Sequence, residues 1–224
     1  MNTIKRVELI DGLRSIAVYW MIIFHTAYDL RLLGFTETDF SSGFWYAFPR
    51  VIAGSFLFVV GISLHLAYSQ GINWSKFWRR QMKVGIGAVI ISIVTYFIFP
   101  TNWIYFGTLH CIFFCTLFGL FFVGKRALIV AALIIMAILM FMGFDIFWVS
   151  NLLQKPSLDF IPVYPWFFCT LLGLFVASFE GFWKFVHNCR TPLFLTLPGR
   201  HSLKIYLLHQ PIIFGVLTLI KNLK

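Results

Sequence analysis

The sequence predicts an all-α integral membrane protein with about seven transmembrane helices and a cytoplasmic N-terminus. Of its 224 residues, 60% are apolar and only 12% are charged, whereas soluble globular proteins carry about 25% charged residues. The apolar residues form successive stretches, each long enough for a helix that crosses the ~30 Å hydrocarbon core of a bilayer. The cations lie mostly in the short connections between these stretches. We therefore expect a single polytopic membrane domain over residues 1–224.

Each apolar stretch predicts one membrane span. Asp11 and Arg14 interrupt the start of the first stretch and no small-residue cleavage site follows, so we expect a permanent helix rather than a cleaved signal peptide. The sixth stretch opens with Pro162 and Pro165 among aromatic residues. Proline is tolerated at the start of a helix because its missing N–H has no partner there. The predicted spans are residues 11–30, 44–68, 82–99, 103–123, 127–148, 163–182 and 202–220.

The cations alternate with the predicted spans, and this alternation sets the expected orientation. They gather in the second, fourth and sixth connections, whereas the first, third and fifth hold few. The positive-inside rule then places the N-terminus in the cytoplasm, although Lys221 and Lys224 would lie outside. This topological role accounts for most of the formal net charge of +10, so we expect no nucleic-acid partner. The connection cations are Lys76, Arg79, Arg80, Lys83, Lys125, Arg126, Lys184, Arg190 and Arg200.

Four ionisable side chains lie on one face of the first predicted helix. At 100° per residue, Asp29 falls at nearly the same angle as Asp11, with His25 about 40° and Arg14 about 60° away. Asp11 and Arg14 lie near the N-terminal end, and ~16 Å of helix separates Arg14 from His25. Because ionisable groups within a membrane helix are costly and mark functional sites, this stripe is the leading candidate site.

His25 and Asp29 are i, i+4 neighbours, close enough for the carboxylate to orient the imidazole. A carboxylate that fixes the tautomer and stabilises the imidazolium makes histidine an effective general base. A buried polar network that packs helices together would also place these groups inside the protein. Two charged pairs at opposite depths of the helix favour a chemical role over packing alone.

Four sequence blocks resemble the transmembrane acyltransferases, and they occur in matching order from end to end of the chain. They are most similar to short bacterial relatives of the heparan-α-glucosaminide N-acetyltransferase family, and the first block is also similar to the acyltransferase-3 family. The blocks are residues 10–17 (IDGLRSIA) with 24–30 (FHTAYDL), residues 106–112 (FGTLHCI), residues 159–166 (DFIPVYPW), and residues 199–203 (GRHSL) with 206–211 (YLLHQP).

The resemblance implies transfer of an acyl group, expected to be acetyl, from cytosolic acyl-CoA to an acceptor at the outer side, usually a sugar. On that pattern His25 is the catalytic histidine and Arg14 belongs to the acyl-CoA path. Acyl-CoA (acetyl-CoA) would be a co-substrate, with no permanently bound cofactor and no metal. The expected partners are the lipid bilayer, acyl-CoA and a carbohydrate or glycolipid acceptor, and homo-oligomer formation is left open.

Two further groups of residues are candidates for acyl-CoA binding. CoA carries several phosphates, and arginine binds phosphate bidentately, so cations of the cytoplasmic connections fit this role. The polar side chains of the last helix fall within an arc of about 100°, which either lines an acyl-CoA tunnel or packs against another helix. From these groups we select Arg79, Arg80, Arg200, Tyr206 and His209 as acyl-CoA-binding candidates, with Ser202 and Gln210 on the same helix face.

An acceptor pocket is expected near the outer ends of the helices. His110 lies at the depth of His25 and is either a polar wall of this pocket or a satisfied core histidine. Asp159 and Trp166 flank the start of the sixth span, where Trp suits the membrane interface and Asp159 has no such explanation. Arg50 either snorkels to the interface or pairs with a carboxylate at that side.

Two other classes of function remain open. Intramembrane aspartate and histidine also build proton relays, so the chain could be a small-molecule or proton-coupled transporter. Transporters often show internal repeats and interrupted helix pairs, and neither is found here. A non-catalytic partner of a cell-envelope complex would leave the stripe on the first helix unexplained. The short chain and loops favour a bacterial plasma (inner) membrane.

Overall fold

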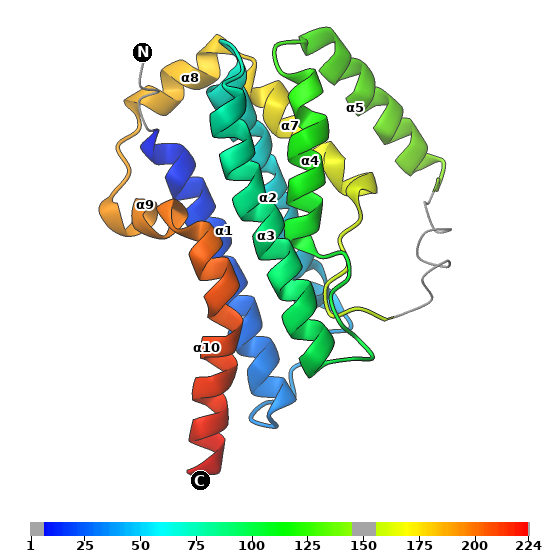
Figure 1. The fold of residues 1–224 in the computed structure, drawn as a ribbon, viewed down its shortest axis with the longest axis vertical. Helices are drawn as coiled ribbons and strands as arrows, with labels where there is room; N and C mark the ends of the chain where they lie inside the picture. Colours follow the sequence, from blue (N-terminus) through cyan, green and yellow to red (C-terminus); the bar gives the residue numbers. More distant parts are fainter. Residues whose placement is uncertain (1–6, 145–155, 224) are drawn as a thin grey trace. The chain divides into compact units, whose positions relative to one another are not determined.

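The computed structural model describes residues 7–144 and 156–223, and most of these residues are helical (Figure 1). No β-strand occurs in these ranges, in which Phe106 and Phe160 form an isolated parallel bridge. The all-α prediction is therefore confirmed for the described part of the chain. The helices are α1 (Glu8–Leu32), α2 (Gly43–Tyr68), α3 (Trp74–Ile98), α4 (Thr108–Phe122), α5 (Arg126–Phe141), α7 (Val163–Ala177), α8 (Glu180–Asn188), α9 (Leu193–Arg200) and α10 (Ser202–Asn222).

The lengths and hydropathy of the helices indicate an integral membrane protein. Among the described residues, α2, α3 and α10 are each long and apolar enough to cross a membrane. α7 and α8 meet that criterion only together, across a bend of 83°, and make a fourth candidate span. α4 and α5 are apolar but shorter. The 25 residues of α1 extend ~38 Å, with charged side chains in its first and last turns.

Each predicted span coincides with a helix, but some helix ends differ. α3 begins at Trp74 rather than at residue 82, because the Asn73 side chain accepts a hydrogen bond from the backbone N–H of Lys76 at 3.0 Å and caps the helix. The cations expected in the second connection therefore lie on the first turns of α3. α5 ends at Phe141 rather than at 148, before a left-handed Gly143 with φ +66°. Residues 145–148 of that predicted span lie outside the described residues.

The sixth predicted span, residues 163–182, is broken in the structure, because α7 ends at Ala177 and α8 begins at Glu180. The rest of α8 and all of α9 lie where the sequence predicts only a connection. The two helices have 9 and 8 residues, which is little more than two turns and too short for a helical period to stand out. Pro198 also lies inside α9, and proline is normally read as ending a helix. The helical structure of this connection was therefore not predicted from the sequence.

The chain divides into two compact units, and each is described by itself. The terminal unit comprises the described residues of 5–56 and 187–224, with α1, α9 and α10. The central unit comprises the described residues of 57–186, with α3, α4, α5 and α7. The first half of α2 belongs to the terminal unit and its second half to the central unit.

In the central unit, glycines bring the second half of α2 against α7. A Cβ at Gly61 would overlap the carbonyl oxygen of Thr170, and a Cβ at Gly173 would overlap that of Phe58. The Thr170 hydroxyl donates a hydrogen bond to the carbonyl oxygen of Leu57 at 3.3 Å. Small residues allow this close approach. Helices in lipid gain little from the hydrophobic effect, so close van der Waals packing of this kind stabilises their association.

In the terminal unit, α1 packs against α9 and α10, and α1 and α10 run side by side (Figure 1). The Tyr19 hydroxyl of α1 donates a hydrogen bond to the carbonyl oxygen of Phe194 in α9 at 2.8 Å. The polar face of α1 therefore has two partners, α9 along its N-terminal half and α10 along the rest.

Candidate active site

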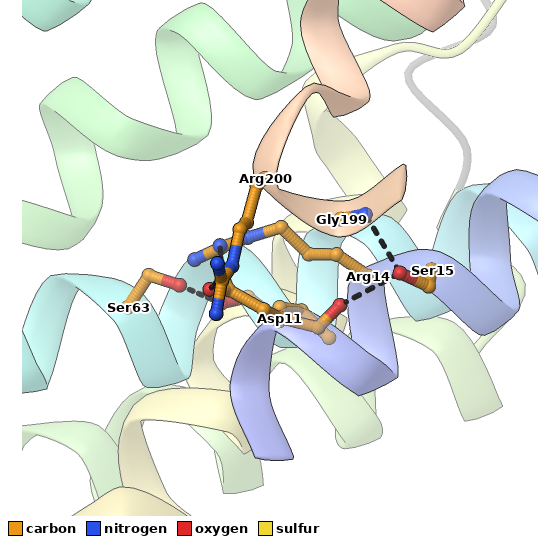
Figure 2. Close-up of polar contacts among 7 residues, drawn as sticks. Asp11, Arg14, Ser15, Ser63, Gly199 and Arg200 are labelled. Atoms are coloured by element: carbon orange, nitrogen blue, oxygen red, sulfur yellow. Dashed lines mark hydrogen bonds and ion pairs between the residues drawn. The ribbon is translucent and has the colours of Figure 1, made fainter. Parts of the chain in front are cut away.

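Two arginines surround a buried carboxylate at the N-terminal end of α1. Arg14 Nη1 lies 2.7 Å from Asp11 Oδ1, and Arg200 Nε of α9 lies 3.7 Å from Asp11 Oδ2. Only 4% of the Asp11 side chain is exposed, against 23% for Arg14 and 31% for Arg200. Figure 2 shows these three side chains, which we call the arginine cluster. Two guanidinium groups against one carboxylate give the cluster a net positive charge, as an anion site needs.

The arginine cluster depends on a close contact between α1 and α9. The Ser15 hydroxyl donates to the Asp11 carbonyl oxygen at 3.1 Å and accepts from the backbone N–H of Gly199 at 2.6 Å (Figure 2). A Cβ at Gly199 would overlap that same carbonyl oxygen. Glycine is therefore required for α9 to approach α1, and this approach places Arg200, the next residue, beside Asp11.

Further along α1, His25 faces His209 of α10. The two ring centroids are 4.8 Å apart, and the ring planes are inclined by 61°. His209 is buried, with 9% of its surface exposed, while His25 is half-buried. His209 Nδ1 lies 2.8 Å from the carbonyl oxygen of Tyr206, one turn earlier in α10. The structure thus joins the polar stripe of α1 to the polar face of α10.

Asp29 is fully buried, and its carboxylate is held by Gln210 rather than by His25. Gln210 Nε2 donates to both carboxylate oxygens, at 2.9 and 3.1 Å. No hydrogen bond joins Asp29 to His25 in the described structure, so the expected pairing along α1 is not formed. A buried carboxylate needs a donor, which an N–H of α10 supplies directly. The Gln210 Oε1 atom is buried without a described partner.

An aromatic cluster borders His25 on the side of α2. The Phe24 ring centroid lies 5.4 Å from that of His25 and within 6.5 Å of the Tyr28, Phe40 and Trp45 rings. His25 therefore contacts both this aromatic cluster, through Phe24, and the imidazole of His209.

The connection after α1 is held by its own polar contacts. Asp39 accepts hydrogen bonds from the Ser41 backbone and hydroxyl and from the Ser42 hydroxyl, at 2.6–2.8 Å. These bonds, those of Ser41 first, lower the pKa of Asp39 to about 2. Arg31 also donates to the carbonyl oxygen of Thr38. The connection is thereby fixed next to the aromatic cluster.

Comparison with models of known protein families shows to which family the chain belongs. The family model described as heparan-alpha-glucosaminide N-acetyltransferase, catalytic, matches residues 6–211. The chain belongs to this family. The match includes every residue selected above from the sequence, from Arg14 to His209. Comparisons with curated proteins and with solved structures gave no match. Membership in the heparan-alpha-glucosaminide N-acetyltransferase family implies a membrane enzyme with acetyltransferase activity in general.

In this family member, two of the predicted acceptor-pocket residues meet at the start of α4. Asp159 Oδ2 accepts hydrogen bonds from the backbone N–H of Thr108 at 2.7 Å and from its hydroxyl at 3.0 Å. His110 Nδ1 accepts from the backbone N–H of Gly107 at 3.1 Å, and its Nε2 lies 3.2 Å from the Ser92 hydroxyl. Both side chains thus hold backbone groups of this helix terminus, as caps do. These bonds agree with the satisfied-histidine reading of His110.

The other site residues predicted from the sequence lie on several different helices. Trp166 of α7 packs against the buried cluster of Leu57, Cys111 and Cys115 in the central unit. Arg50 is exposed, and its guanidinium lies 3.9 Å over the Tyr46 ring rather than against a carboxylate. Arg79 and Arg80 are exposed on the first turns of α3. The centroid of the Tyr206 ring lies 5.8 Å from that of the His209 ring.

Three residues that build the site were not selected as site residues from the sequence. Gln210 lies on the predicted polar face of α10, so its position was detectable although its partner was not. Ser15 lies one turn from Asp11, but serine in a helix usually bonds only the preceding turn. Gly199 precedes Arg200, and its need for close packing depends on α9, which was not predicted.

Proposed function

We propose that the protein transfers an acetyl or other acyl group from cytosolic acyl-CoA to an extracytoplasmic acceptor, a sugar hydroxyl or amine. The chain would cross the membrane about seven times with its N-terminus in the cytoplasm, in the plasma membrane of a bacterium. His25 acts as the general base. The arginine cluster binds the acyl donor.

The arrangement along α1 is the observation that carries this proposal, together with the family assignment. CoA has its phosphates at one end and its thioester at the other, so its site needs cations and a base that are well separated. The arginine cluster lies at one end of this path, and His25 lies ~16 Å further along the same helix. Tyr206 and His209 of α10 border the path at the level of His25.

The reaction needs one proton acceptor and no covalent enzyme intermediate. His25 removes the proton from the acceptor hydroxyl or amine as its oxygen or nitrogen attacks the thioester carbon. The new bond to the acyl carbon forms and the C–S bond breaks. The proton on His25 then leaves with the CoA thiolate, so that the products are acylated acceptor and free CoA. General-base catalysis of this kind contributes about 10²–10⁴-fold in rate.

The remaining assignments of the proposal come from the sequence. Arg79 and Arg80 are further cations for the CoA phosphates. Asp159, Trp166 and Arg50 are proposed as contacts for the acceptor, while His110 keeps its role at the start of α4.

Release of CoA thiol by purified protein tests the proposed function. Acetyl-CoA is supplied with glucosamine as the probe acceptor, and wild type is compared with His25→Ala and with Tyr96→Phe, which removes one exposed hydroxyl of α3. We expect His25→Ala to lose at least about 10²-fold in kcat while Tyr96→Phe keeps the wild-type rate. Turnover that is equal in His25→Ala and wild type would remove His25 from the chemistry. A carrier that uses the same buried groups would show flux but no CoA release.

A further inference from the structure

His209 carries a buried nitrogen that the described residues leave without a partner. Its Nδ1 contacts the Tyr206 carbonyl oxygen at 2.8 Å, and because a carbonyl oxygen only accepts hydrogen bonds, Nδ1 carries the proton. The neutral ring therefore has its lone pair on Nε2. This atom is buried and has no hydrogen-bond partner within residues 7–144 and 156–223. A buried acceptor without a donor is costly, so Nε2 is poised to receive an N–H or O–H.

His25 is placed to supply that donor. The 4.8 Å between the ring centroids puts the two imidazoles in contact, edge to face. No described residue forms a hydrogen bond with the His25 ring, and Asp29 is occupied by Gln210. A neutral imidazole has one N–H and one lone pair. A turn of the His25 ring that directs its N–H to His209 Nε2 leaves the other ring nitrogen free to accept a proton.

We propose that His209 is the positioning residue for His25. Its Nε2 accepts the N–H of His25 and fixes His25 in the tautomer whose other nitrogen faces the acceptor. This assignment rests on the proposed function of His25, and it replaces the acyl-CoA-binding role that the sequence suggested for His209. The Tyr206 carbonyl oxygen in turn fixes the tautomer of His209.

The proton balance follows from this chain of groups. His25 takes the acceptor proton on its free nitrogen as the acceptor attacks the acyl carbon, and it gives this proton to the departing CoA thiolate. His209 keeps its own proton on Nδ1 throughout and stabilises the transient imidazolium of His25 through the hydrogen bond to Nε2. This is the orienting role that a carboxylate has in serine hydrolases, and an imidazole fills it here because the nearby carboxylate of Asp29 is bound to α10.

The test compares two substitutions of His209 in the full-length protein. His209→Phe keeps an aromatic ring but has neither nitrogen, whereas the amide of His209→Gln can present an acceptor oxygen near the Nε2 position. With acetyl-CoA and glucosamine as probes, we expect His209→Phe to lower kcat by about 10²-fold and to leave the KM for acetyl-CoA unchanged. His209→Gln should recover part of the lost kcat. Thermal unfolding of each variant checks its fold. If His209→Phe does not fold, the kcat and KM of His209→Gln are compared with those of wild type instead.

A second readout follows His25 itself. Diethyl pyrocarbonate modifies the neutral nitrogen of histidine, and mass spectrometry reports the rate at His25 separately from the other five histidines. The rate at His25 should change several-fold in His209→Phe, because the ring loses its fixed tautomer. An unchanged rate together with unchanged kcat in folded His209→Phe would overturn the proposal, as would a raised KM for acetyl-CoA with unchanged kcat. Absence of CoA release by wild type would instead refute the proposed function, while the modification rates would still decide the contact between the two histidines.

Discussion

Replacement of Gly199 by alanine tests how the arginine cluster is assembled. The added Cβ would overlap the backbone carbonyl oxygen of Asp11, which has no flexible end that could move away. α9 must then separate from α1, and the hydrogen bond from the Gly199 N–H to the Ser15 hydroxyl is stretched or lost. Forced overpacking costs about 1–3 kcal/mol, and the hydrogen bond contributes about 0.5–1.5 kcal/mol. The better helix propensity of alanine returns up to about 1 kcal/mol, so the net loss is about 2 kcal/mol.

Gly215→Ala is the matched control, since Gly215 lies in α10 and a Cβ there meets no atom within 4 Å. Thermal or denaturant unfolding in detergent should show Gly199→Ala less stable than wild type and Gly215→Ala equal or slightly more stable. Acetyl-CoA affinity should fall only in Gly199→Ala, because Arg200 moves away from Asp11. Equal stability of the two variants would refute the close contact between α1 and α9.

Three further predictions concern the carboxylates of Asp29, Asp159 and Asp39. Asp29→Leu leaves the Gln210 amide buried without its acceptor and should cost about 1–3 kcal/mol, whereas Asp29→Asn keeps an acceptor oxygen and should cost less; unfolding of the two variants side by side checks this. Asp159→Ala removes the acceptor for Thr108 at the start of α4 and should cost about 0.5–2 kcal/mol, so an unchanged unfolding midpoint would contradict a capping role. The pKa of Asp39 lies near 2 rather than at its usual 3.8, so its stabilising contacts are complete above pH 4 and are lost as the pH falls through about 2. The backbone N–H of Ser41 donates to the Asp39 carboxylate, so its amide resonance should titrate near pH 2. Titration of that resonance near pH 4 would contradict the hydrogen bonds to Asp39.

The polar face of α1 was predictable because it depends only on helix geometry. Residues eighteen positions apart lie at the same angle, so Asp11 and Asp29 had to share a face whatever packed against them. The structure places partners along this face, with Arg200 beside Asp11 and Gln210 beside Asp29. Apolar length likewise located seven of the helices.

The partners themselves were not predictable, for physical reasons. Asp29 and His25 are one turn apart, but the choice between a partner on the same helix and one on α10 depends on interhelical distance, which no local pattern contains. The helix α9 is too short to show a helical period in the sequence. The close contact that requires glycine at position 199, next to Arg200, could therefore not be predicted. The tautomer of His209 follows only from its contact with a carbonyl oxygen of its own helix.

Binding of acetyl-CoA to the detergent-purified protein, measured by calorimetry, decides whether the arginine cluster holds an acyl-CoA donor. Wild type is compared with Arg14→Ala and with Arg31→Ala, an arginine at the opposite end of the same helix. Hydrogen bonds to charged groups contribute about 1.5–3 kcal/mol, so we expect wild type and Arg31→Ala to bind acetyl-CoA alike and Arg14→Ala to bind at least about tenfold more weakly. Failure of wild type to bind either acetyl-CoA or free CoA would contradict an acyl-CoA-dependent acyltransferase.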